Sequence, residues 1–101
     1  MKVKTKQVEF GAGQSDTTVS GALIRGDRDI YQLNARSGQI MALSISSLED
    51  NAVFDLIDPN GTVLGSELKN EKISLPSTGD YQIIIGGIRG NANYDLTIAI
   101  D

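Results

Sequence analysis

Apolar and polar residues alternate strictly along most of this chain. In the last segment, every second residue is apolar: Tyr94, Leu96, Ile98 and Ile100. Because successive side chains of a β-strand point to opposite faces of the sheet, this period predicts strands that bury one face in a core and expose the other to water. The same alternation recurs in earlier segments: residues 19–23, 31–35, 41–45, 54–56, 73–75 and 81–85. The pattern therefore predicts a chain built mainly from short β-strands.

Turn-forming residues separate the alternating segments and join one predicted strand to the next. They are Arg25-Gly26-Asp27, Ser37-Gly38, Asp58-Pro59-Asn60-Gly61, Ser77-Thr78-Gly79 and the run from Gly86 to Asn91. About eight short strands, with no helical stretch of useful length, favour an all-β fold, an antiparallel β-sandwich of jelly-roll-like arrangement. A closed barrel is the alternative, because local patterns do not distinguish the two.

The length of 101 residues suits one domain with its own core. We therefore expect a single β-sandwich domain over residues 1–101, in which residues 1–6 form a flexible N-terminal extension. This extension is positively charged, but no apolar segment follows it, so it does not read as a signal peptide. The protein is then either cytosolic or exported with its leader already removed. No apolar run approaches the length needed to span a bilayer.

The residue types that are missing exclude most enzyme chemistry. The chain has no Cys and no His, which removes disulfides, thiolate nucleophiles, the Ser-His-Asp and Cys-His mechanisms and the commonest transition-metal ligand. Adjacent acidic residues such as Glu49 and Asp50 are typical of a solvated loop, whereas a glycosidase needs two carboxyl groups across a cleft. We therefore expect a protein that is not an enzyme and that uses no cofactor.

The net charge of −4 argues against nucleic-acid binding, which needs a basic surface. It favours solubility, or attraction to a basic protein partner. Arg25-Gly26-Asp27 spells an integrin-binding tripeptide, but a Gly between polar residues is first of all a hairpin turn. Loop oxygens that could ligate Ca²⁺ are found at Asp27, Asp29, Asp58 and Asn60, although their spacing matches no calcium-loop signature.

Two arginines are better candidates for binding a partner. Arg28 stands beside the turn at Gly26, and Arg89 lies between Gly87 and Gly90, which give its loop freedom to protrude. An exposed guanidinium can hold a carboxylate through two parallel hydrogen bonds. For both residues the alternative is a solvated arginine without a partner, which is common on protein surfaces.

Several motifs are spread along nearly the whole chain. They are Val8-Glu9-Phe10, the Gly-containing stretch to Ser15, Ser20-Gly21, Gly26-Asp27 with Asp29 and Tyr31, Gly38-Gln39, Asp58-Pro59-Asn60-Gly61, Leu75-Pro76 with Gly79 and Tyr81, and Tyr94-Asp95-Leu96-Thr97-Ile98. Together they resemble the bacterial periplasmic inhibitors of goose-type (g-type) lysozyme. That family is similar in fold to the bacterial pre-peptidase C-terminal domain, a β-sandwich accessory module of secreted enzymes.

This resemblance implies a β-sandwich that occludes the cleft of a g-type lysozyme with the loops at one of its ends, without chemistry of its own. Carried over to this chain, Arg89 would pair with the catalytic carboxylate, and Arg28 and Asn91 would add polar contacts. The resemblance also implies a periplasmic or secreted protein whose partner is a protein, with no metal, nucleic acid or membrane. The alternative is an accessory module of the pre-peptidase C-terminal type, with calcium-dependent binding as a further option.

Overall fold

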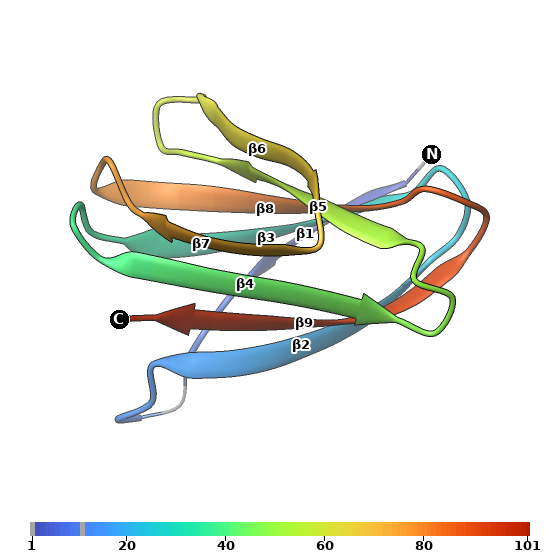
Figure 1. Cartoon of the computed structure of the whole chain (residues 1–101), viewed down its shortest axis with the longest axis horizontal. Helices are drawn as coiled ribbons and strands as arrows, with labels where there is room; N and C mark the ends of the chain where they lie inside the picture. Colours follow the sequence, from blue (N-terminus) through green and yellow to red (C-terminus); the bar gives the residue numbers. More distant parts are fainter. Residues whose placement is uncertain (1, 11) are drawn as a thin grey trace.

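The computed structural model describes residues 2–10 and 12–101, which form nine β-strands (Figure 1). In chain order they are β1 (Val3–Gln7), β2 (Asp16–Leu23), β3 (Arg28–Ala35), β4 (Ile40–Ser47), β5 (Ala52–Ile57), β6 (Val63–Leu68), β7 (Asn70–Ser74), β8 (Gly79–Gly87) and β9 (Ala92–Ile100). Within these residues, no helix is long and apolar enough to cross a membrane. The predicted all-β class is confirmed, with one strand more than the sequence indicated.

The strands form two sheets that pack face to face. One sheet has the order β1-β3-β8-β5-β6, and the other has the order β2-β9-β4-β7. Neighbouring strands run antiparallel, except that β1 and β3 run parallel. Because each sheet ends in edge strands and does not close on itself, the fold is the predicted sandwich and not a barrel.

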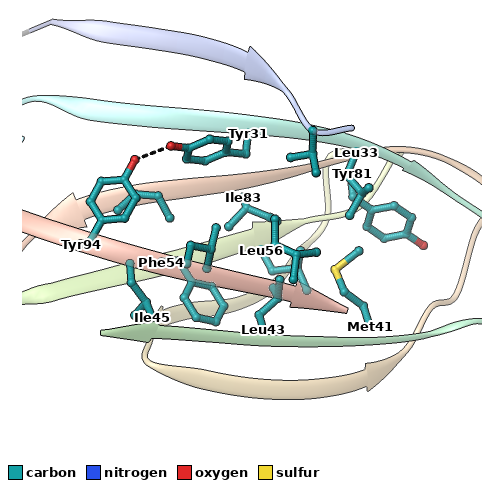
Figure 2. Close-up of a cluster of buried hydrophobic side chains, with 14 of the residues drawn as sticks. Tyr31, Leu33, Met41, Leu43, Ile45, Phe54, Leu56, Tyr81, Ile83 and Tyr94 are labelled. Atoms are coloured by element: carbon teal, nitrogen blue, oxygen red, sulfur yellow. Dashed lines mark hydrogen bonds between the residues drawn. The ribbon is translucent and has the colours of Figure 1, made fainter. Parts of the chain in front are cut away.

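The alternating residues of both sheets meet in one hydrophobic core (Figure 2). In β9, Leu96 and Ile98 are fully buried, and their ladder partners in β4 are Ile45 and Leu43, which are buried as well. The intervening Thr97 is exposed on the outer face. Burying one Leu or Ile side chain contributes about 1.5–3 kcal/mol. Burial of these alternating apolar side chains is therefore the main source of the fold's stability.

The first strand corrects the expectation that residues 1–6 form a flexible extension. Val3–Gln7 pairs in parallel with β3. The Lys6 ammonium lies 5.8 Å from the centre of the Tyr31 ring, which is a cation–π contact. All five side chains of β1 are exposed, so the strand has no apolar pattern, and backbone pairing with β3 determines its position. Met1 lies outside the described residues.

The connections between strands gather at the two ends of the sandwich (Figure 1). The end drawn at the right carries the β2–β3, β4–β5 and β8–β9 connections, residues 24–27, 48–51 and 88–91, and we call it the arginine end. The end drawn at the left carries the β3–β4, β5–β6 and β7–β8 connections, residues 36–39, 58–62 and 75–78, and we call it the opposite end.

Candidate functional site

The connections of the arginine end are tied together by Asn51. Its side chain is 1% exposed, and its Nδ2 donates to the carbonyls of Arg89 and Asn91, each at 2.8 Å. Its own carbonyl accepts the N–H of Ile88 at 2.9 Å. The β2–β3 connection joins the same group, because the N–H of Arg25 donates to Asn91 Oδ1 at 2.8 Å. A buried amide thus fixes the loop that presents Arg89.

The β4–β5 turn is held from both sides. The Ser47 hydroxyl accepts two of the backbone N–H groups that follow the turn, at 2.8 and 3.1 Å. Arg89 Nη2 donates to the carbonyl of Glu49 at 3.0 Å. From the other side, Lys69 Nζ lies 2.9 Å from the Asp50 carboxylate and donates to the Asp50 carbonyl at 3.3 Å. These bonds leave the turn little conformational freedom.

Arg89 and Asn91 are exposed, as residues that contact a partner must be. A guanidinium carries five N–H donors, so the single bond from Arg89 to Glu49 leaves most of them for a carboxylate. Asn91 accepts the N–H of Arg25 through Oδ1, and its amide nitrogen is a further donor. The geometry therefore leaves hydrogen-bond donors of Arg89 and Asn91 exposed at this loop.

Arg28 is half-buried at the start of β3. Its Nη1 donates to the carbonyl of Asp27 at 2.8 Å. The side chain lies across β8 at Gly86, where an added Cβ would stand only 3.0 Å from Arg28 Nε. It helps to line a recess of about 110 Å³ with Val53, Asp55, Glu67, Ile84, Gly86, Gly87 and Ile88. Arg28 thus shares an end of the sandwich with Arg89 but uses different hydrogen-bond partners.

Exposed aliphatic side chains also concentrate at the arginine end. In the described part of the chain, the exposed large hydrophobic residues are Val3, Ile24, Leu48, Val63 and Ile88. Three of them lie in or beside the three connections of this end, and Val3 is the ladder partner of Arg28. Of the five, Val63 alone belongs to the opposite end. Arginine combined with apolar side chains is the composition that protein interfaces favour.

A buried polar network joins the two sheets beneath the arginine end. Tyr94 Oη donates to Asp29 Oδ2 at 2.5 Å and lies 2.7 Å from Tyr31 Oη (Figure 2). Burial, followed by the hydrogen bonds to Asp29 and Tyr31, raises the pKa of Tyr94 far above its usual value. Gly21 makes room for the ring, since an added Cβ would stand 2.6 Å from Tyr94 Cζ. The network fixes β3, and with it Arg28, against β9.

Three of the four residues considered for calcium, Asp27, Asp29 and Asp58, have a carboxylate oxygen that accepts a hydrogen bond within the protein. Asp58 Oδ1 accepts the N–H of Asn60 at 2.9 Å and that of Thr62 at 2.8 Å. Asp27 Oδ1 accepts the N–H of Lys2 at 2.9 Å, which engages the carboxylate of the Arg-Gly-Asp tripeptide in the turn. Across residues 2–10 and 12–101, no three acidic side chains converge on a position that could hold a metal ion.

The residues that hold this site together were not predicted. Ser47 and Asn51 lie in or beside a turn that contains neither Gly nor Pro, and whose turn-forming residues are Ser, Asp and Asn. Asp50 supplies the left-handed residue instead, with φ of 54°. The available signal was the run of polar residues around a single Leu48, which interrupts the alternation between two apolar strands.

No protein-family model and no curated protein matches the chain. Solved structures do match it. PliG from Aeromonas hydrophila, a periplasmic lysozyme inhibitor of g-type lysozyme, is similar with a TM-score of 0.89 and 24% identity over 99% of this chain and 98% of that chain. PliG from Salmonella Typhimurium has a TM-score of 0.79 and 28% identity, over 97% of this chain and 98% of that one. This chain has the PliG fold.

A more distant neighbour of the PliG-like fold is the pre-peptidase C-terminal domain of a collagenase from Bacillus anthracis. Its TM-score is 0.68 and its identity 16%, over 98% of this chain and 94% of that chain. The sequence motifs therefore identified both structural relatives, and they ranked them in the order that the structures give. The greater likeness to PliG is seen in both the TM-score and the sequence identity.

Proposed function

We propose that this chain is a non-enzymatic inhibitor of g-type lysozyme that acts in the periplasm. The observation that carries the proposal is the match to PliG over nearly the full length of both proteins, with 28% identity to the Salmonella protein. The collagenase domain is less similar both in structure and in sequence, so it supports the shared sandwich and favours no second function.

The arginine end is the proposed contact surface. Enzymes that cleave glycosidic bonds use carboxyl groups in a cleft, and a guanidinium can pair with a carboxylate in two parallel hydrogen bonds. Arg89 is exposed and supported from below by Asn51. It would make the central contact, with Arg28 and Asn91 adding polar contacts beside it. Binding there blocks the cleft without any reaction.

The net charge supports attraction to a basic partner. The chain carries a net charge of −4, and the three connections of the arginine end hold Arg25 and Arg89 together with the acids Asp27, Glu49 and Asp50, with Arg28 beside them. An acidic body would be attracted to a basic lysozyme as a whole, and the arginines would then enter its acidic cleft. Such complementarity raises the association rate and fixes the orientation.

The direct test is a cell-wall lysis assay with a purified g-type lysozyme and increasing amounts of this protein. Stoichiometric loss of lysozyme activity is the expected result. Lysis that stays unchanged at micromolar protein contradicts the proposed function. Parallel assays with chicken-type and invertebrate-type lysozymes measure how selective the inhibition is.

The contact surface is tested by Arg89→Ala. We expect inhibition to weaken at least tenfold, about 1.4 kcal/mol of binding free energy, because a central guanidinium is lost. Arg36→Ala is the matched control, because Arg36 is an exposed arginine of the opposite end. Equal inhibition by both variants would show that the Arg89 side chain is not the central contact.

A further inference from the structure

Leu48 has an unusual position for a leucine. It is 94% exposed, more than any other large hydrophobic residue in the described part of the chain. A single exposed aliphatic residue is common on protein surfaces and needs no explanation by itself. The surroundings of Leu48 are what distinguish it, because the turn below it is held rigidly and a groove opens beside it.

The rigid turn holds Leu48 at a fixed position. Ser47, Arg89 and Lys69 all bond to this turn, so its backbone is already in one conformation before a partner arrives. Binding through a mobile loop would cost conformational entropy, whereas a side chain on a fixed turn avoids most of that cost. The strand-to-strand connection itself needs no leucine at this place, since the Ser47 and Asp50 bonds form through the backbone and polar groups.

The groove lies directly beside Leu48 on the outer face of the four-stranded sheet. It has a volume of about 800 Å³ and is lined by Ser20, Gly21, Ala22, Ser46, Ser47, Leu48, Asn93, Tyr94 and Asp95. Most of these side chains are small, and Ser20 is bonded to Asp95 across β2 and β9. The groove is therefore wide enough for a segment of another protein, and Leu48 stands at its edge.

We infer that Leu48 is the apolar anchor of a second contact region, in which the rim of the bound lysozyme lies along this groove. The inference rests on the proposed function, because it extends the contact from Arg89 to the turn that Arg89 holds. The exposed acid Glu49 directly follows Leu48, whereas the carboxylate of Asp50 is paired with Lys69, so the charge of Glu49 favours an apolar surface with a basic residue beside it. The arginines meet the acidic cleft, and the Leu48 turn meets the basic rim.

The test compares Leu48→Ser with Val63→Ser in binding to an immobilised g-type lysozyme. Val63 is 55% exposed and lies at the opposite end, which makes it a matched control. We expect Leu48→Ser to raise the Kd at least tenfold, mostly through faster dissociation, and Val63→Ser to leave it unchanged. Because both side chains are exposed, both variants should melt close to the wild-type temperature.

The groove is tested separately by Ala22→Tyr, with Thr18→Tyr as its control on the same face of β2. Ala22 lines the groove and Thr18 does not, so only Ala22→Tyr should weaken binding. Wild-type affinity in both Leu48→Ser and Ala22→Tyr, while wild-type protein still inhibits, overturns the inference alone. Absence of any binding by the wild-type protein overturns the proposed function together with it. A wild-type dimer that Leu48→Ser dissociates in sedimentation, without a change in lysozyme affinity, also overturns it.

Discussion

The two ends of the sandwich are built from the same kind of connection and differ in what they expose. At the opposite end the polar groups are used internally: Tyr81 Oη donates to the Ser77 carbonyl at 2.6 Å, and Ser37 N–H donates to Thr78 Oγ1 at 2.9 Å. At the arginine end the corresponding bonds come from Asn51 and Ser47, which lie at the base of the connections. The side chains above them, Arg89 and Leu48 among them, are exposed.

This difference shows how one fold separates stability from binding. The opposite end uses turn residues with small side chains, and it is constrained by close packing, as between Gly79 and Pro59, and by hydrogen bonds between its connections. The arginine end uses a buried amide to fix the backbone, so that long side chains are free to contact another molecule. Substitutions at the opposite end should therefore change stability, and substitutions at the tips of the arginine end should change binding.

Gly79→Ala should give the largest loss of stability. Gly79 has φ of 147°, and an added Cβ would stand 2.8 Å from the Cβ of Pro59. Backbone strain and the clash together should cost about 3 kcal/mol, measured by urea unfolding. Gly26→Ala, at an open position of the arginine end with φ of 88°, should cost less because it lacks the clash. At a temperature where it is folded, Gly79→Ala should inhibit lysozyme as well as wild type does. Weakened inhibition would contradict the view that the opposite end affects stability and not binding.

Asn51→Ala is expected to affect both properties. It removes the donors to the carbonyls of Arg89 and Asn91 and leaves a space in a buried position. The expected loss of stability is about 2 kcal/mol, and inhibition should weaken because the β8–β9 loop loses its support. Asn60→Ala is the control at the opposite end, where the amide is exposed. If Asn51→Ala inhibits as well as wild type, the loop does not need to be preorganised.

The Tyr94 network predicts a loss of stability at alkaline pH. The folded-state pKa of Tyr94 is raised above the ordinary value of 10.0, first by burial and then by its hydrogen bond to Asp29. Below pH 10 the tyrosine is protonated in both the folded and the unfolded state, and its stabilising effect is complete. Above pH 10 only the unfolded chain loses this proton, so the free energy of unfolding should fall by about 1.4 kcal/mol per pH unit. Tyr94→Phe should flatten this slope, and an equally steep slope in that variant would contradict the assignment.

The core strands could be predicted because their information is local. Leu96 and Ile98 alternate with polar residues, and burial follows directly from the period of two. In contrast, β1 (Val3–Gln7) has five exposed side chains, and only its long-range pairing with β3 makes it a strand. The strand β6 was not predicted either. Its register against β5 shifts between Phe54 and Leu56 and between Leu56 and Ile57, and such a bulge interrupts the simple alternation.

The candidate site could be predicted in part. Arg89 was recognisable as an exposed loop residue because Gly87 and Gly90 flank it, and the structure places Arg28 at the same end. The support under Arg89 was not recognisable, because Asn51 is 38 residues away in sequence and no local pattern marks a buried amide. An exposed loop residue can be recognised from its neighbours in the sequence, whereas the residues that position it can be recognised only from tertiary contacts.

The smallest effect is expected for Asp50→Asn, which removes the ion pair with Lys69 at the arginine end. The two side chains are 77% and 38% exposed, and such surface pairs contribute no more than about 1 kcal/mol. Asn tolerates the left-handed backbone of this position, where φ is 54°, so the substitution removes the charge without adding strain. We expect a loss of about 0.5 kcal/mol in low salt that disappears in high salt, because exposed charges are screened.

A larger loss that persists in high salt would mean that the Asp50 carboxylate holds the turn. The contrast between the ends would then need revision, because the arginine end would depend on a surface charge and not on its buried groups. The bonds argue for the smaller effect. Ser47 Oγ still accepts its two N–H groups, and Lys69 can still donate to the Asp50 carbonyl after the carboxylate is gone. Leu48 should therefore stay in place, and binding to lysozyme should be unchanged.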